Sequence, residues 1–109
     1  MGQWRDLGEM TLTMKTSGPA VRLCVEGELD IATVDALRAA VEQLRIHRRG
    51  TLLDLDEVAF IAAGSAAMLA TTVSTARVQR WDFAVAGISE RVRRVMNLTG
   101  LDISVDDAA

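Results

Sequence analysis

With 109 residues, half of them apolar, the chain is long enough to bury one core, and no second domain fits. The formal net charge of -3 argues against nucleic-acid or membrane partners, whose anionic surfaces require a concentrated basic face. The single Cys24 excludes an internal disulfide, and we expect a cytoplasmic protein without a membrane-spanning segment.

The first half of the chain predicts a hairpin and a helix. Residues 1–9 show no periodicity and are interpreted as an N-terminal leader, which could pair with a sheet through Trp4. Strands are predicted at residues 11–15 and 20–26, because Gly18 and Pro19 interrupt the ladder between them. A helix is predicted to begin at an N-cap, Thr33, and to end at a basic run that caps it, residues 47–49. Its apolar stripe is Val34, Leu37, Val41 and Leu44.

The second half of the chain predicts further strands that alternate with helices. Residues 51–55 predict a buried strand, residues 83–86 a further strand, and Ser89 a cap for a helix from residue 90 to about 97 that Gly100 ends. A short edge strand is expected at residues 103–105, before an acidic tail. Between these elements, residues 64–79 predict a helix that faces the sheet with Met68, Leu69, Thr72, Val73 and Ala76. The order of elements predicts an α/β fold, with a mixed β-sheet of four to five strands covered by helices.

The sequence does not predict an enzyme. Ser65 lacks both flanking glycines of a nucleophile elbow, and the lone His47 lies at a basic helix end. Asp54, Asp56 and Glu57 form an acidic cluster at a strand end, for which a solvated loop is favoured over a metal site. Neither a phosphate-binding loop nor a dinucleotide fingerprint occurs, so no cofactor is expected.

Three stretches resemble one protein family. They are GELD (residues 27–30) before Thr33, LDLDEVAFI (residues 53–61) before a small-residue helix start, and GISERVRRVMNLTGLDISV (residues 87–105). Together they resemble the anti-sigma factor antagonists of the STAS domain family, between residues 11 and 105. The resemblance implies a single STAS domain at residues 10–106, with residues 107–109 as a tail. It also implies that the protein binds a kinase-like anti-sigma factor, which carries the ATP, and so frees a sigma factor for transcription.

The resemblance fails at the position where members of the family are phosphorylated. After the equivalent of residues 60–61, the family pattern is Asp-Ser, then Ser or Ala, then Gly, and the partner kinase phosphorylates the first Ser. An ungapped match places Ala62 at the Asp and Ala63 at the acceptor, followed by Gly64 and Ser65. Because alanine has no hydroxyl, we expect one fixed, always competent state. Ser65 is the candidate substitute for phosphorylation, and its alternative role is capping or small-residue packing in the first helical turn.

The resemblance also implies where the partner binds. Asp30 has two interpretations, a contact with the anti-sigma factor and a local role in orienting the chain that enters the helix. An alternative function for the whole chain is a STAS scaffold or ligand-sensing subunit that assembles with other STAS proteins. The expected partner-binding residues are Asp30, Thr33, Ala62, Ala63, Gly64, Ser65 and Ala66.

Overall fold

The computed structural model describes residues 3–7 and 10–98. The elements in this part of the chain alternate much as the sequence predicts. In order they are β1 (Gln3–Leu7), β2 (Met10–Ser17), β3 (Ala20–Leu29), α1 (Val34–Ile46), β4 (Gly50–Ile61), α2 (Ala63–Gln79), β5 (Phe83–Ile88) and α3 (Glu90–Leu98).

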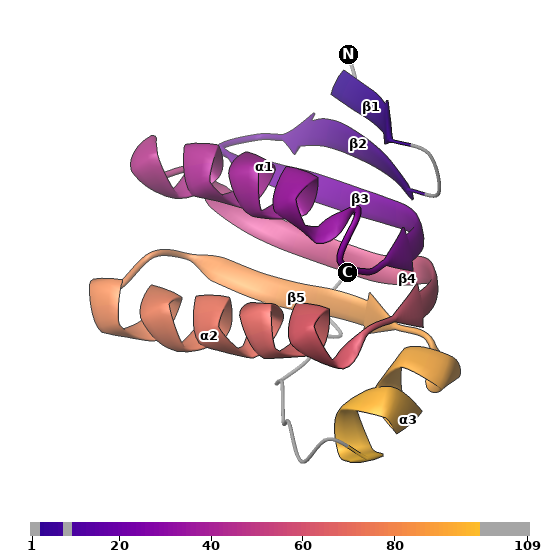
Figure 1. Ribbon diagram of the computed structural model, residues 1–109. Helices are drawn as coiled ribbons and strands as arrows, with labels where there is room; N and C mark the ends of the chain where they lie inside the picture. The colour runs from indigo at the N-terminus through magenta and orange to yellow at the C-terminus, as the bar shows by residue number, and fades with distance from the viewer. Residues whose placement is uncertain (1–2, 8–9, 99–109) are drawn as a thin grey trace.

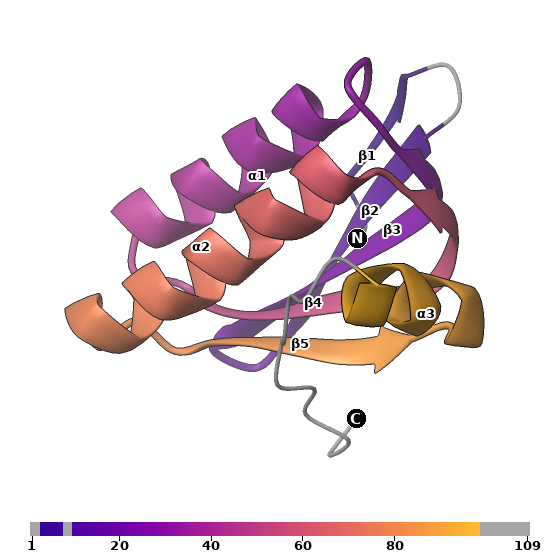
Figure 2. The same cartoon turned by 60° about the horizontal axis from the view of Figure 1, so that its bottom comes forward.

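The five strands form one mixed sheet in the order β1-β2-β3-β4-β5 (Figure 1). The first three strands pair antiparallel, whereas β4 pairs parallel with both β3 and β5. Parallel neighbours need a crossover connection, which α1 and α2 supply on the same face of the sheet (Figure 2). The predicted fold class is therefore confirmed. The interpreted leader contains an edge strand, in which Trp4 is in register with Thr13 of β2.

The core lies between the sheet and the two crossover helices. All four residues of the predicted α1 stripe are buried, and on α2 Leu69 and Ala76 are buried as predicted. Met68, Thr72 and Val73 are all partly buried, and Met68 and Val73 pack against this core. None of the helices in the described segments is long and apolar enough to cross a bilayer.

Strand β4 is longer than the predicted strand at residues 51–55. Its pairing with β3 shifts register twice, between Cys24 and Glu26 and between Gly27 and Glu28. Each shift adds a residue to β4, so its inward side chains after Leu55 are three apart and the period-two pattern disappears. The interpretation of Asp54, Asp56 and Glu57 as a loop is therefore wrong, because all three lie within β4.

Helix α3 begins at the predicted cap. The Ser89 hydroxyl accepts a hydrogen bond from Val92 N–H at 3.3 Å and donates one to the Val58 carbonyl at 3.0 Å, which ties the helix to β4. Val92 and Met96 are buried. The helix lies at the end of the sheet where β5 ends (Figure 2). The predicted stop at Gly100, the edge strand at residues 103–105 and the acidic tail lie outside the described residues.

The basic run after α1 also has the predicted capping role. His47 Nδ1 lies 2.8 Å from the Gln43 carbonyl oxygen of its own helix. The Arg48 guanidinium instead donates to the carbonyl groups of Gln79 and Arg80, at 3.2 and 3.3 Å. These carbonyl groups lie at the end of α2, so the run stabilises the C-terminal ends of both crossover helices.

Two glycines are expected to respond to alanine in opposite ways. Gly87 has φ of +64°, and an added Cβ would lie 3.1 Å from Asp54 Oδ1 and from Asp56 Cβ. Gly87→Ala should therefore lower the free energy of unfolding by more than about 1 kcal/mol. Gly64 lies in the first turn of α2, where an added Cβ meets nothing within 4 Å. Gly64→Ala should raise the free energy of unfolding by roughly 0.5 kcal/mol.

Urea titration of both variants and of the unmodified protein measures this difference. Equal changes in both variants would contradict the prediction, because of these two glycines only Gly87 combines a left-handed backbone with a crowded Cβ position.

Candidate partner-binding surface

Two turns meet at one edge of the sheet. Because β3 and β4 are parallel, both end at this edge, with Leu29 in register with Ile61. The Ala62 N–H then donates a 2.8 Å hydrogen bond to the Leu29 carbonyl. This bond holds the turn from Asp30 to Thr33 beside the start of α2, as Figure 2 shows at the upper end of both helices.

Asp30 organises the turn that enters α1. Its Oδ1 accepts hydrogen bonds from the backbone N–H groups of Ala32 at 2.9 Å and Thr33 at 3.2 Å. Its carbonyl oxygen accepts from Thr33 and Val34, at 3.1 and 2.9 Å. These bonds satisfy N–H groups that have no partner within the helix, so the local role expected for Asp30 is confirmed.

Thr33 stands at the N-cap position of α1, but its hydroxyl is used elsewhere. Its side chain makes no capping hydrogen bond to the helix. The hydroxyl donates to the Glu28 carbonyl at 2.7 Å and accepts from Asp30 N–H at 3.0 Å. Since Thr33 is only 3% exposed, these bonds satisfy polar groups that water cannot easily reach. Thr33 therefore joins the turn to the end of β3.

The first turn of α2 combines exposed and buried small residues. Ala62 is the N-cap, with an extended backbone and no side chain that could accept a hydrogen bond. Within the described helix, the first turn carries no acidic side chain, so nothing there offsets the positive end of the helix dipole. Ala63 and Gly64 are exposed, whereas Ser65 and Ala66 are 2% and 0% exposed.

The burial of Ser65 bears on its two expected roles. A kinase must reach the hydroxyl it modifies, and at 2% exposure this hydroxyl faces the protein. Small-residue packing is thus the role that the geometry favours. Of the expected binding residues, Asp30, Ala62, Ala63 and Gly64 are accessible, while Thr33, Ser65 and Ala66 are buried.

Two large apolar side chains at this edge were not predicted. Ile31 follows Asp30 in the turn and is 91% exposed, and Phe60 lies one pair before the end of β4 and is 46% exposed. The sequence held one signal for Ile31, since it is an apolar residue that falls outside the stripe of the following helix.

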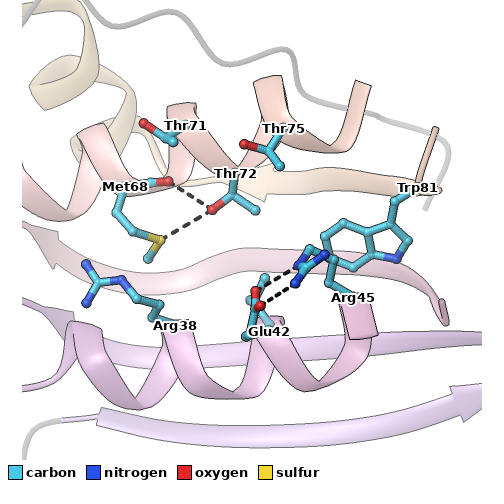
Figure 3. Close-up of a pocket in the computed structure, with 9 residues that line it drawn as sticks. Arg38, Glu42, Arg45, Met68, Thr71, Thr72, Thr75 and Trp81 are labelled. Carbon is cyan, nitrogen blue, oxygen red and sulfur yellow. Dashed lines mark hydrogen bonds and ion pairs between the residues drawn. The ribbon is translucent and has the colours of Figure 1, made fainter. Parts of the chain in front are cut away.

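A separate shallow cavity of about 120 Å³ lies between α1 and α2 (Figure 3). Several of its polar side chains are engaged by other protein groups. Arg45 pairs with Glu42 and so lowers the pKa of the Glu42 carboxyl group, while the Thr72 hydroxyl donates to the Met68 carbonyl at 2.9 Å. Arg38 pairs with Asp35 outside the cavity. We therefore assign the candidate function to the sheet edge and not to this cavity.

The opposite face of the sheet carries an ion pair. Arg22 Nε and Nη2 donate to Asp54 Oδ2 at 3.1 and 2.8 Å, and this hydrogen bonding raises the pKa of the guanidinium. Asp54 Oδ1 accepts from Asp56 N–H at 2.9 Å. Both oxygens of Asp54 thus have protein partners, and the residues that the structure describes contain no cluster of three or more metal-ligating side chains.

Comparison with known proteins places this fold. The profile of the family described as "Mlab, STAS domain" matches residues 12–106. The crystal structure of an anti-sigma factor antagonist from Mycobacterium paratuberculosis is similar, with a TM-score of 0.72 and 25% sequence identity over 84% of this chain and 78% of that chain. The anti-sigma factor antagonist SpoIIAA in its unphosphorylated form gives a TM-score of 0.64 at 17% identity, over 83% and 81% of the two chains. No curated protein matches the sequence significantly.

The buried hydroxyl of Thr33 should contribute measurably to stability. Thr33→Val keeps the shape of the side chain but leaves the Glu28 carbonyl and the Asp30 N–H without their present partner. We expect the free energy of unfolding to fall by about 1–3 kcal/mol. Thr71→Val, at an exposed position of α2, is the matched control and should change it by less than about 0.5 kcal/mol. Equal losses in urea titrations of the two variants would argue against the proposed role of Thr33.

Proposed function

Since the chain belongs to the STAS domain family, we propose that it acts as an anti-sigma factor antagonist. In this proposal it binds a kinase-type anti-sigma factor and competes with the sigma factor that the same protein holds. The freed sigma factor is then available for transcription. The mechanism is competition between two binding partners, so it requires no catalytic group or cofactor on this chain.

The observation that carries the proposal is the junction of the Asp30 turn with the start of α2. A hydrogen bond between Ala62 and Leu29 fixes the two segments relative to each other. The accessible residues lie on both segments, so a partner could contact both at once. The similar solved structures are anti-sigma factor antagonists, which supports this assignment.

We further propose that the binding state is fixed. A phosphate at the start of α2 would be held by the unpaired N–H groups there, and its charge of about -2 would oppose a close apolar contact. Ala63 has no hydroxyl to receive it, and the hydroxyl of Ser65 is buried. The accessible surface at this position therefore keeps one chemical form, whether or not the kinase is active.

The missing hydroxyl at Ala63 is equally compatible with a scaffold that assembles with other STAS proteins. Titration calorimetry with each purified kinase-type anti-sigma factor of the source organism separates the two functions. An antagonist binds one of them and displaces its sigma factor in a competition assay. A scaffold binds none of them and instead forms a stable complex with a second STAS protein.

Restoring the family's two residues should create a kinase substrate. We expect the variant with both Ala62→Asp and Ala63→Ser to gain the mass of one phosphate when incubated with the bound anti-sigma factor and ATP. The single variant Ala62→Asp is the matched control, because it carries the new charge without the hydroxyl. Intact-mass spectrometry measures the change, and an unmodified double variant would contradict a kinase-type partner of the usual specificity.

Substitution of Asp30 should weaken partner binding. Asp30→Lys removes the acceptor of two backbone N–H groups and reverses a charge beside the contact, so we expect Kd to rise about tenfold or more. Asp30→Asn removes the charge but keeps an oxygen that can accept the same hydrogen bonds. A smaller rise in Kd for this variant would show that part of the effect of Asp30→Lys comes from the loss of the turn's hydrogen bonds or from the added positive charge.

Asp82→Lys is the matched control, because Asp82 is an exposed carboxylate that precedes β5 at the other end of the molecule. The same Kd for Asp30→Lys and Asp82→Lys in calorimetry would show that Asp30 is not part of the partner-binding surface.

A further inference from the structure

We propose that Ile31 is the apolar anchor of the partner-binding surface and inserts into an uncharged apolar pocket on the anti-sigma factor. The inference rests on the proposed function, because it specifies the chemistry by which that surface recognises its partner. No role in binding was expected for Ile31 from the sequence.

The exposure of Ile31 is the first observation. At 91% it is the most exposed large apolar side chain in the described part of the chain. The others are Ile46, Phe60, Val78 and Leu98. Phe60 lies at the same end of β4, since it pairs with Glu28 just before the turn. Two apolar side chains thus flank the segment that the proposal already assigns to the partner.

The second observation is that several hydrogen bonds hold the turn that contains Ile31. The residue lies between Asp30 and Ala32, which are joined by the hydrogen bond from Ala32 N–H to Asp30 Oδ1. The Thr33 N–H also donates to Asp30 Oδ1, and the buried Thr33 hydroxyl donates to the Glu28 carbonyl of β3. These bonds favour the backbone conformation in which Ile31 is exposed, and such preorganisation lowers the entropy lost on binding.

The third observation is the charge around Ile31. In residues 30–33 and 60–66, Asp30 is the only residue that carries a charge. Its Oδ1 is engaged by two backbone N–H groups, so the carboxylate is directed partly to its own turn. The part of a partner surface that meets Ile31 needs an apolar pocket, because a charged group placed against this side chain would lose water without gaining an ion pair.

A second copy of this chain fits less well as the occupant. The cavity between α1 and α2 is bordered by Arg38, Glu42 and Arg45 (Figure 3), so Ile31 of another copy would meet a charged rim. An exposed apolar side chain on a hydrogen-bonded turn is instead the type of residue that can contribute strongly to a protein–protein interface when it fills a pocket.

The test compares Ile31→Ala with Val78→Ala. Val78 is 84% exposed near the end of α2, far along the chain from the proposed surface, and serves as the matched control. The probe is the purified anti-sigma factor that the unmodified protein binds in calorimetry. We expect Ile31→Ala to raise Kd about tenfold or more and Val78→Ala to change it less than about twofold. Both variants should keep the melting temperature of the unmodified protein, since neither side chain is packed.

The outcomes separate this inference from the proposed function. If the unmodified protein binds an anti-sigma factor and Ile31→Ala binds it equally well, the anchor is overturned while the proposed function stands. If no anti-sigma factor binds the unmodified protein, both are overturned. If sedimentation shows that Ile31→Ala instead abolishes self-association of the unmodified protein, the occupant is a second copy and the inference is overturned.

Discussion

The parallel pairing of β3 with β4 is the constraint on which the candidate surface depends. Parallel strands end at the same edge of a sheet, and the two helices that follow them must begin there. Leu29 and Ile61 are the last pair in register, and the Ala62 N–H continues the ladder by one bond to the Leu29 carbonyl. Segments far apart in the chain are thereby held side by side by a backbone hydrogen bond.

Two small buried residues with hydroxyl groups, Thr33 and Ser65, lie beneath the accessible residues at this edge. Thr33 is buried with its hydroxyl hydrogen-bonded, and the described part of the chain contains no buried side-chain polar atom without a partner. Ser65 likewise places a small side chain under the first turn of α2, where a larger one would have to displace the core. The surface residues are therefore supported by packing from beneath, which is the condition for presenting them in one arrangement.

The sequence predicted elements whose signals are local and failed where tertiary structure intervened. Helix α1 was predicted well because its stripe, its start and its end agree along one segment. The predicted range of β4 was too short, because two register shifts break the period-two pattern of the strand. Such shifts depend on the pairing with the neighbouring strand. The local role of Asp30 could be predicted, and Ile31 carried one signal because it falls outside the stripe of α1. The burial of Ser65 could not be predicted, because it depends on how α2 packs on the sheet.

The absence of charge at Ala62 and Ala63 has a consequence for recognition as a whole. A surface that holds a carboxylate and a phosphate acceptor can change its electrostatic potential, and its partner can be released by repulsion. Here the accessible residues at the helix start are alanine and glycine, beside an exposed isoleucine. A contact through these uncharged residues would depend on apolar area and shape, which salt does not alter strongly. In the proposed function, alanine at the acceptor position therefore removes a phosphorylation switch and leaves an apolar contact, together with Asp30, to hold the partner.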